Sequence, residues 1–516
     1  MFKDPFYKRT VPILIGIFIL SVIVRLPTLN RPLSKHHEFC TAVALRVLHT
    51  WSERGIDTYE GLPVMTYPGE PNKHINNHAS SSGEMKDESG NFYYVSHPPF
   101  GYYFPHTVFS LFQIKPTVAS IQIFNLGTNV ITAFFIYFTI CLLGTNRARS
   151  DLFIPGLIGY GIYLFNPATL WFQSNVYMSD TLVHGFFVIG VYTALKMFIR
   201  QRFRVPKYLI TYLSFVFLMC YTSWLGYFFA FSAVLYSLIK SRKNKEFLIP
   251  SLIGMGGAVL AMALTIWQYG QIAGYDALQA EWMSRAMERG SLIGQERGWL
   301  GYLYTKALET KTVLFNYITS YLPIYFLLIY FTRRILRARR MRIVFTRNGY
   351  RFLWLSSLPI ILLHFTLLNY SGHDFTTLYG SLFLSVLVGI MFDKIFHGQP
   401  EGRRALLIAY SITIVAMIAQ FYFINRPGEV SLRGDRYEKY LVSGESVMKE
   451  SHPDEVVFLL RQKPMPELVW YAKRNIQQVY SRGDALKWMD EFSASKGVII
   501  ELDEDGQIIS AEHLPN

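Results

Sequence analysis

VPILIGIFILSVIVRL, residues 11–26, is an apolar run that lies within a segment, 11–28, long enough to cross a lipid bilayer. The polar sequence RPLSKHHE follows at residues 31–38. The first cluster of ionisable side chains therefore falls where the chain leaves the membrane. A histidine pair beside a carboxylate is a poor membrane anchor, but it suits chemistry on a substrate that the membrane presents.

The composition indicates an integral membrane protein. Hydrophobic residues make up 51% of the 516 residues and charged residues only 17%, and the hydrophobic residues occur in long blocks. The formal net charge of +14 could suggest a nucleic-acid partner. However, the basic residues lie in short loops between apolar blocks, as topology signals do, and this distribution argues against nucleic-acid binding.

The apolar blocks predict about eleven transmembrane helices of roughly twenty residues each. The residues before the first block are basic, and no small-residue cleavage site follows the block. We therefore expect a retained span and not a removed signal peptide. The predicted spans are 11–28, 118–143, 152–168, 176–199, 208–222, 224–240, 247–269, 312–331, 352–370, 375–392 and 404–424.

Basic residues gather in every second loop, most densely between residues 333 and 342. This pattern predicts a multi-pass protein of the cell (inner or plasma) membrane with a cytoplasmic N-terminus. The opposite side then holds two long outer loops of the domain 1–425, namely 30–117 and 270–311. Within the first of them, residues 100–113 predict a helix lying on the outer surface rather than a further span.

The segment 426–516 has an ordinary composition without long apolar blocks. Residues 455–460 and 497–502 are typical of strands, and residues 467–474 and 485–492 of helices. Alternation of strands and helices predicts a small extracytoplasmic α/β domain. The fold expected for the whole chain is thus an α-helical polytopic membrane protein with a small C-terminal α/β domain.

Glu38 and His37 are the first candidates for catalysis. A carboxylate at the outer end of the first span could act as general base on an acceptor hydroxyl. His37 could share the proton, orient the acceptor or bind a metal ion. The alternative is an interfacial salt bridge of Glu38 with Arg31 or Lys35.

His97 and Asp180 stand at two further returns to the membrane. Pro98 and Pro99 impose a rigid extended entry that would hold His97 in place, although a histidine that caps the following helix fits equally well. Asp180 begins an apolar span, where a carboxylate is usually functional or paired. Its alternative role is a helix cap together with Ser179.

Three arginines and a short turn complete the candidates for substrate binding. Arg285 and Arg289 are four residues apart and share one helix face, which suits a phosphate group or, alternatively, lipid headgroups in general. Arg297 follows in the same loop, and His373 and Asp374 occupy a turn between two spans. Ionisable residues from widely separated loops thus face one membrane boundary, which packing alone does not predict.

These motifs resemble the polytopic C-type glycosyltransferases, which include the protein O-mannosyltransferase and aminoarabinose transferase families. The resemblance covers residues 8–424 and rests on the motif after the first span, on His97-Pro98-Pro99, and on the stretch from Asn166-Pro167 to Asp180. The family motif after the first span is usually Asp-Glu, whereas this chain has His37-Glu38. Either Glu38 serves as the base, or Asp180 supplies the carboxylate with support from His37.

The resemblance implies transfer of a monosaccharide from a polyprenyl-phosphate carrier to an acceptor on the outer face by inverting displacement. The acceptor would be a lipid-linked glycan, a cell-envelope polymer or a protein. Lys35, Arg285 or Arg289 would stabilise the departing phosphate. No cofactor is required, although a divalent metal could bind through His37, Glu38 and Asp180.

The alternative functions are a polytopic transporter or lipid flippase and an adaptor protein. Transporters place polar residues near the midplane of the bilayer, and the two halves of their sequence are often related to each other. This chain instead has its polar residues at the outer boundary.

Overall fold

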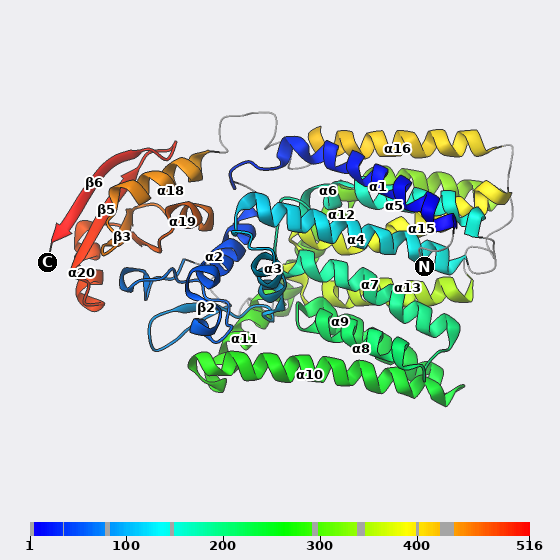
Figure 1. The fold of residues 1–516 in the computed structure, drawn as a ribbon, viewed down its shortest axis with the longest axis horizontal. Helices are drawn as coiled ribbons and strands as arrows, with labels where there is room; N and C mark the ends of the chain where they lie inside the picture. Colours follow the sequence, from blue (N-terminus) through cyan, green and yellow to red (C-terminus); the bar gives the residue numbers. More distant parts are fainter. Residues whose placement is uncertain are drawn as a thin grey trace.

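The computed structural model describes residues 5–34, 36–77, 83–144, 149–290, 298–337, 346–398, 402–423 and 438–515. A long helical bundle forms one end of the molecule and a small sheet with its helices forms the other, with an outer layer of short elements between them (Figure 1). This layer and the adjoining ends of the bundle contain those candidate residues that the structure describes.

Each predicted span coincides with a helix of the bundle. These helices are α1 (Pro5–Arg25), α4 (Val118–Leu143), α5 (Phe153–Phe165), α7 (Ser179–Arg200), α8 (Pro206–Cys220), α9 (Trp224–Ser241), α10 (Leu248–Ala273), α12 (Gly298–Arg337), α13 (Arg347–Thr366), α15 (Gly380–Gly398) and α16 (Arg403–Phe423). Among the described residues, 8 helices are long and apolar enough to cross a membrane. The predicted count of eleven spans is therefore not confirmed: α5 and α8 have only 13 and 15 residues, and α13, with 20 residues, is not among the eight either.

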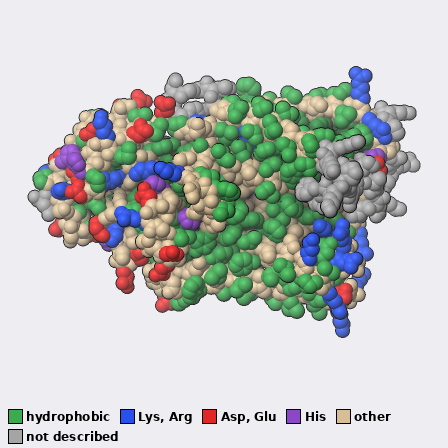
Figure 2. Space-filling model, in the orientation of Figure 1, with side chains coloured by type: hydrophobic (Ala, Val, Ile, Leu, Met, Phe, Trp, Pro, Cys, Tyr) green, Lys and Arg blue, Asp and Glu red, His purple; other side chains and the backbone are tan. Residues whose placement is uncertain are grey.

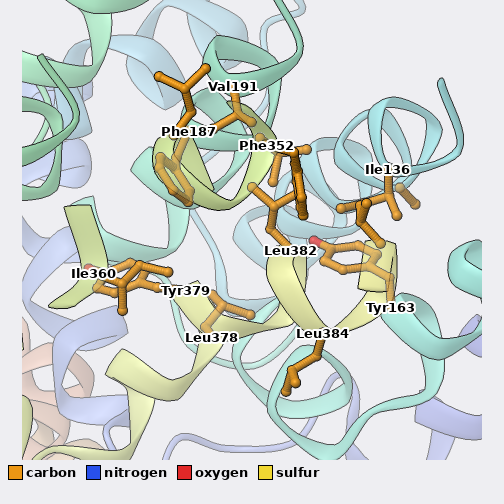
Figure 3. Close-up of a cluster of buried hydrophobic side chains, with 14 of the residues drawn as sticks. Ile136, Tyr163, Phe187, Val191, Phe352, Ile360, Leu378, Tyr379, Leu382 and Leu384 are labelled. Atoms are coloured by element: carbon orange, nitrogen blue, oxygen red, sulfur yellow. The ribbon is translucent and has the colours of Figure 1, made fainter. Parts of the chain in front are cut away.

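The interior of the bundle is a continuous apolar core. Figure 3 shows part of it, where Tyr163, Phe187 and Leu382 come from α5, α7 and α15 and are all fully buried. On the outside, large apolar side chains such as Val259 and Phe326 are exposed, and hydrophobic surface dominates the bundle in Figure 2. Such a surface is stable in lipid and not in water, so the chain is a multi-pass membrane protein.

Local sequence explains how α7 comes to begin at the outer layer. Asn166 ends α5 and accepts a hydrogen bond from the Thr169 N–H at 2.9 Å, and Pro167 starts the short helix α6 (Pro167–Phe172). A side-chain cap followed by proline is a strong helix start. The chain then turns and enters α7 at Ser179, which brings Asp180 into the first turn of that helix.

The outer layer is assembled from three segments. The first contains α2 (Glu38–Arg54), the antiparallel strands β1 (Glu84–Lys86) and β2 (Phe92–Tyr94), and α3 (Phe100–Leu111). The others contribute α11 (Tyr275–Arg289), α14 (Leu368–Ser371) and the 3-10 helix η8 (Asp374–Tyr379). The predicted short helix at residues 100–113 is present as α3, and most of the segment 270–311 is helical.

The C-terminal sheet has the strand order β4-β3-β5-β6. Its strands β4 (Ile476–Val479), β3 (Val456–Leu460) and β5 (Lys496–Leu502) are parallel, and β6 (Ile508–Pro515) is antiparallel to β5. The helices are α18 (Lys439–Glu450), α19 (Pro466–Ala472) and α20 (Arg482–Glu491). The predicted strands and helices match β3, β5, α19 and α20, whereas β4, β6 and α18 were not predicted.

Hydrogen bonds join the C-terminal sheet to the outer layer. The side chain of Asn77 bonds both backbone groups of Ile476, donating to the carbonyl at 2.6 Å and accepting from the N–H at 2.8 Å. The Tyr471 hydroxyl accepts the Leu33 N–H at 2.7 Å, and α19 packs against α2. The C-terminal region therefore contacts the segment that carries the histidine pair.

Glu467→Gln should make the stability of the protein less dependent on pH. Burial raises the pKa of Glu467 from about 4.5 to about 7, and the charge of Glu38 contributes further. A carboxyl with a raised folded-state pKa stabilises the fold below pH 4.5, and this stabilisation is lost as pH rises through 7. We expect the melting temperature of the wild type to fall over this range. The loss corresponds to about 3 kcal/mol and should be absent in Glu467→Gln.

The matched control is Glu445→Gln, which changes an exposed glutamate on α18. Thermal melting in detergent between pH 4.5 and pH 8 measures all three proteins. An equal pH slope in wild type and Glu467→Gln would contradict the assignment of this effect to Glu467.

Candidate active site

A cavity of about 330 Å³ lies between the outer layer and the bundle. It is lined by six of the ten residues singled out in the sequence, which come from five segments far apart in the chain: His37, His97, Asp180, Arg285, Arg289 and His373. Glu38 and Asp374 adjoin this group without lining the cavity, and Lys35 and Arg297 lie outside the described residues.

Asp180 is a buried carboxylate held by hydroxyl groups. Its Oδ1 accepts hydrogen bonds from Ser223 Oγ and from the Tyr379 hydroxyl, both at 2.8 Å, and the Tyr370 hydroxyl is a third donor. The N-cap of α7 is Met178, so the alternative role of Asp180 as a cap is not what the structure shows. Its position at the cavity wall leaves it able to accept a proton from a bound molecule.

His97 connects Asp180 with Arg289. Its Nε2 lies 3.5 Å from Asp180 Oδ2 and 3.4 Å from Arg289 Nη2, and its Nδ1 lies 3.3 Å from Ser223 Oγ. Burial lowers the pKa of His97 to about 3, against the opposing charge of Asp180, so the imidazole is neutral. It does not cap α3, whose N-cap is Pro99.

The contacts of the neutral imidazole imply one direction of hydrogen bonding. Because Ser223 donates its proton to Asp180, its oxygen is free to accept Nδ1–H of His97. Nε2 is then the acceptor for Arg289. A chain of hydrogen bonds thus runs from Arg289 through His97 and Ser223 to Asp180.

Arg289 is a buried cation at the end of α11. Its side chain stacks over the Tyr370 ring at 4.8 Å from the centroid, and the residue is 7% exposed. In the described part of the chain, its Nε and Nη1 have no hydrogen-bond partner and it forms no ion pair. Arg285, in contrast, pairs with Glu288 at 2.8 Å. A buried guanidinium with unused donors at a cavity wall favours an anionic ligand.

Glu38 forms the salt bridge that the sequence offered as an alternative. Its Oε1 lies 2.6 Å from Arg31 Nη2, and its Oε2 accepts from Arg31 Nη1 at 3.1 Å and from the Ser34 N–H at 3.0 Å. The residue is fully buried. This two-point pair at the start of α2 fixes the segment that carries the histidines.

His36 and His37 converge on Asp374 beside the cavity. His36 Nε2 lies 2.8 Å from Asp374 Oδ2, and His37 Nε2 lies 3.1 Å from Asp374 Oδ1. The His373 ring lies 5.4 Å from that of His37. The sequence pattern could have suggested His36, which adjoins His37, and Tyr370, which lies in the same outer turn as His373. Ser223 and Tyr379 carried no signal, because only the fold brings their hydroxyls to Asp180.

Comparison with known proteins gives likeness at the level of structure only. No family model and no curated protein matches the sequence. ArnT from Cupriavidus metallidurans in the apo state aligns with 96% of this chain and 94% of its own, at a TM-score of 0.56 and 10% identity. The same protein bound to undecaprenyl phosphate aligns with 97% of this chain and 93% of its own, at a TM-score of 0.55 and 10% identity.

The archaeal oligosaccharyltransferase AglB from Archaeoglobus fulgidus, in complex with an inhibitory peptide and a dolichol-phosphate, is a further match. It aligns with 96% of this chain and 70% of its own, at a TM-score of 0.53 and 11% identity. The chain therefore has the C-type glycosyltransferase fold.

Proposed function

We propose that this protein is a membrane glycosyltransferase that moves a monosaccharide from a polyprenyl-phosphate carrier to an acceptor on the outer face of the membrane. One observation carries the proposal: the cavity pairs a buried carboxylate, Asp180, with a buried arginine, Arg289, that has unused donors. The fold is in keeping with this chemistry, since its structural neighbours were solved with undecaprenyl phosphate and dolichol-phosphate.

Arg289 is the proposed site for the phosphate of the carrier. Its Nε and Nη1 would bind two phosphate oxygens. Arg285 lies at the same wall, where its pair with Glu288 offsets part of its charge. When the bond between the anomeric carbon and the phosphate oxygen breaks, the electron pair remains on that oxygen. Fixed donors aimed at developing negative charge lower the barrier for such a step.

Asp180 is the proposed base. It would take the proton of the acceptor hydroxyl while that oxygen attacks the anomeric carbon from the side opposite the phosphate, and this single displacement inverts the anomeric centre. Asp180 is favoured over Glu38 because it lines the cavity, whereas both oxygens of Glu38 are engaged by Arg31. His37, at the same wall, would orient the acceptor.

A metal held by His37, Glu38 and Asp180 does not fit these contacts. Glu38 has a two-point contact with Arg31 and a backbone N–H, and it does not reach the cavity. The proton and phosphate steps above require no cofactor.

The arrangement of charge supports a cytoplasmic N-terminus and an outer cavity. α7 and α12 run from the cavity end to basic ends at Arg200 and Arg337, and Figure 2 shows lysine and arginine gathered at the end of the bundle away from the sheet. Basic residues gather on the cytoplasmic side of cell membranes. The segment 426–516 would then be an extracytoplasmic domain, and a reporter fused after residue 516 should be outside.

Glu38→Gln should destabilise the protein without removing the base. Loss of the carboxylate leaves Arg31 without its buried counter-charge, which costs about 3–5 kcal/mol. We expect a lower melting temperature in detergent and retained turnover in the folded fraction. Glu53→Gln, which removes a half-exposed partner of His49, is the control. An unchanged melting temperature together with lost turnover would return the role of base to Glu38.

Carrier binding tests the proposed function directly. Undecaprenyl phosphate and dolichyl phosphate should raise the melting temperature of the purified protein, whereas the corresponding free alcohols should not. A lipid flippase would also bind the carrier, so a sided flux assay in vesicles is needed beside it. Binding of the carrier without its movement across the vesicle membrane supports the transferase proposal. Movement of a sugar-loaded carrier across the membrane, with its sugar still attached, would contradict that proposal.

A further inference from the structure

We propose that His36, His37 and Asp374 form a binding site for a divalent transition-metal ion of the zinc class beside the cavity. One nitrogen from each histidine and one carboxylate oxygen of Asp374 all lie within 4.8 Å of one another. Ligand distances of about 2.0–2.2 Å place ligand atoms about 3–4 Å apart around a bound ion, so a small inward shift of these side chains is enough for all three to bind one ion.

The fold brings this cluster together from distant parts of the chain. Asp374 lies 338 and 337 residues from His36 and His37. The two imidazole rings are edge to face, with centroids 4.9 Å apart. Both histidines have left-handed backbone conformations, with φ of 45° and 65°, which cost energy in residues other than glycine. This conformation points both Nε2 atoms at the same carboxylate.

Neighbouring groups hold the ligand-bearing segments in place. The Trp171 indole donates to the His36 carbonyl at 3.3 Å, and Thr377 Oγ1 donates to the Asp374 carbonyl at 2.6 Å. The side chains of the cluster are 11% to 15% exposed, so an ion can enter while most water is excluded. Support of this kind around the ligands is typical of metal sites.

The donor set indicates the class of ion. Two imidazoles with one carboxylate suit zinc, cobalt, nickel or iron, whereas magnesium and calcium prefer a shell made of oxygen atoms. Three protein ligands leave a coordination position open. His37 also lines the cavity, so an ion bound here would lie directly beside a molecule in the cavity.

Co²⁺ binding tests the site without relying on turnover. The full chain should be purified with a tag that contains no histidine, stripped with chelator and titrated with Co²⁺, whose visible absorption reports coordination by nitrogen and oxygen. We expect one Co²⁺ per chain, displaced by Zn²⁺ and not by Mg²⁺. His37→Gln and Asp374→Asn should weaken binding by more than about 100-fold, since even supporting residues cost 10- to 100-fold.

His106→Gln is the matched control, because His106 is a half-buried histidine of α3 outside the cluster. Melting temperatures establish that each variant is folded, and Asp374→Glu keeps a carboxylate if Asp374→Asn is not folded. Absence of the absorption in folded wild type, or equal binding by His37→Gln, would overturn the proposal. The contacts of Asp374 with the two imidazoles would then be hydrogen bonds that hold the turn in place and not part of a metal site. Neither result bears on the transferase proposal, since no sugar donor is present.

Discussion

Asp180→Asn should reduce the rate of sugar transfer by about 10²–10⁴-fold, the contribution expected of a positioned general base. The amide has nearly the same shape as the carboxylate, but it cannot accept a proton. Binding of the carrier should persist, because Arg289 is unchanged. The measurement is single-turnover transfer with a saturating polyprenyl-phosphate sugar, beside a thermal shift with the free polyprenyl phosphate.

The control for this variant is Asp393→Asn. Asp393 is a buried aspartate near the opposite end of α15, where it pairs with His397 at 3.1 Å. It should match Asp180→Asn in its effect on folding and leave transfer near the wild-type rate. Normal transfer by folded Asp180→Asn would remove Asp180 from the role of base.

Arg289→Gln should weaken binding of the carrier phosphate by about 10- to 150-fold. This range corresponds to a hydrogen bond with a charged group, which is worth about 1.5–3 kcal/mol. Transfer should also slow, because the departing phosphate loses its main buried donor. Arg289→Lys should recover only part of both losses, since an ammonium group lacks the planar pair of donors.

Arg54→Gln removes an exposed arginine at the end of α2 and should leave carrier binding unchanged. Titration with undecaprenyl or dolichyl phosphate, followed by melting temperature, compares the variants. If Arg289→Gln bound the carrier as tightly as wild type does, the phosphate would have to lie elsewhere in the protein.

The sequence was most informative about the helical architecture. Long apolar runs with basic loops located every helix of the bundle, because a lipid environment demands apolar surfaces over whole spans. The boundaries were less predictable. α12 extends over 40 residues, well beyond its predicted span, because turns of mixed polarity before the apolar run and a basic turn after it continue the helix at both ends.

Short elements of the C-terminal region were predicted only in part. β3 and β5 are buried, and their continuous apolar runs made them visible. β4 carries two glutamines between its buried ends, and β6 is an edge strand with mostly exposed side chains. Such strands owe their structure to pairing with a neighbour, which local sequence does not encode.

For the candidate site, the sequence indicated charged residues better than their partners. His37, His97, Asp180 and Arg289 are conspicuous because ionisable groups are rare at the edge of an apolar segment. Their partners are common residues whose importance depends on the fold. Ser223 and Tyr379 contact Asp180 only because the start of α9 and the end of η8 meet the start of α7. The sequence also could not decide between Glu38 and Asp180, since pairing with Arg31 is a tertiary contact.

The most direct test of the central claim is a reconstituted transfer assay with wild type and Asp180→Asn. Both proteins would receive a panel of radiolabelled undecaprenyl- and dolichyl-phosphate sugars, with a membrane extract as the source of acceptor. The account predicts that wild type releases free polyprenyl phosphate in an amount equal to the sugar gained by the acceptor, and that Asp180→Asn releases almost none. A folded wild type that leaves every carrier intact, or an equal release by both proteins, would contradict it.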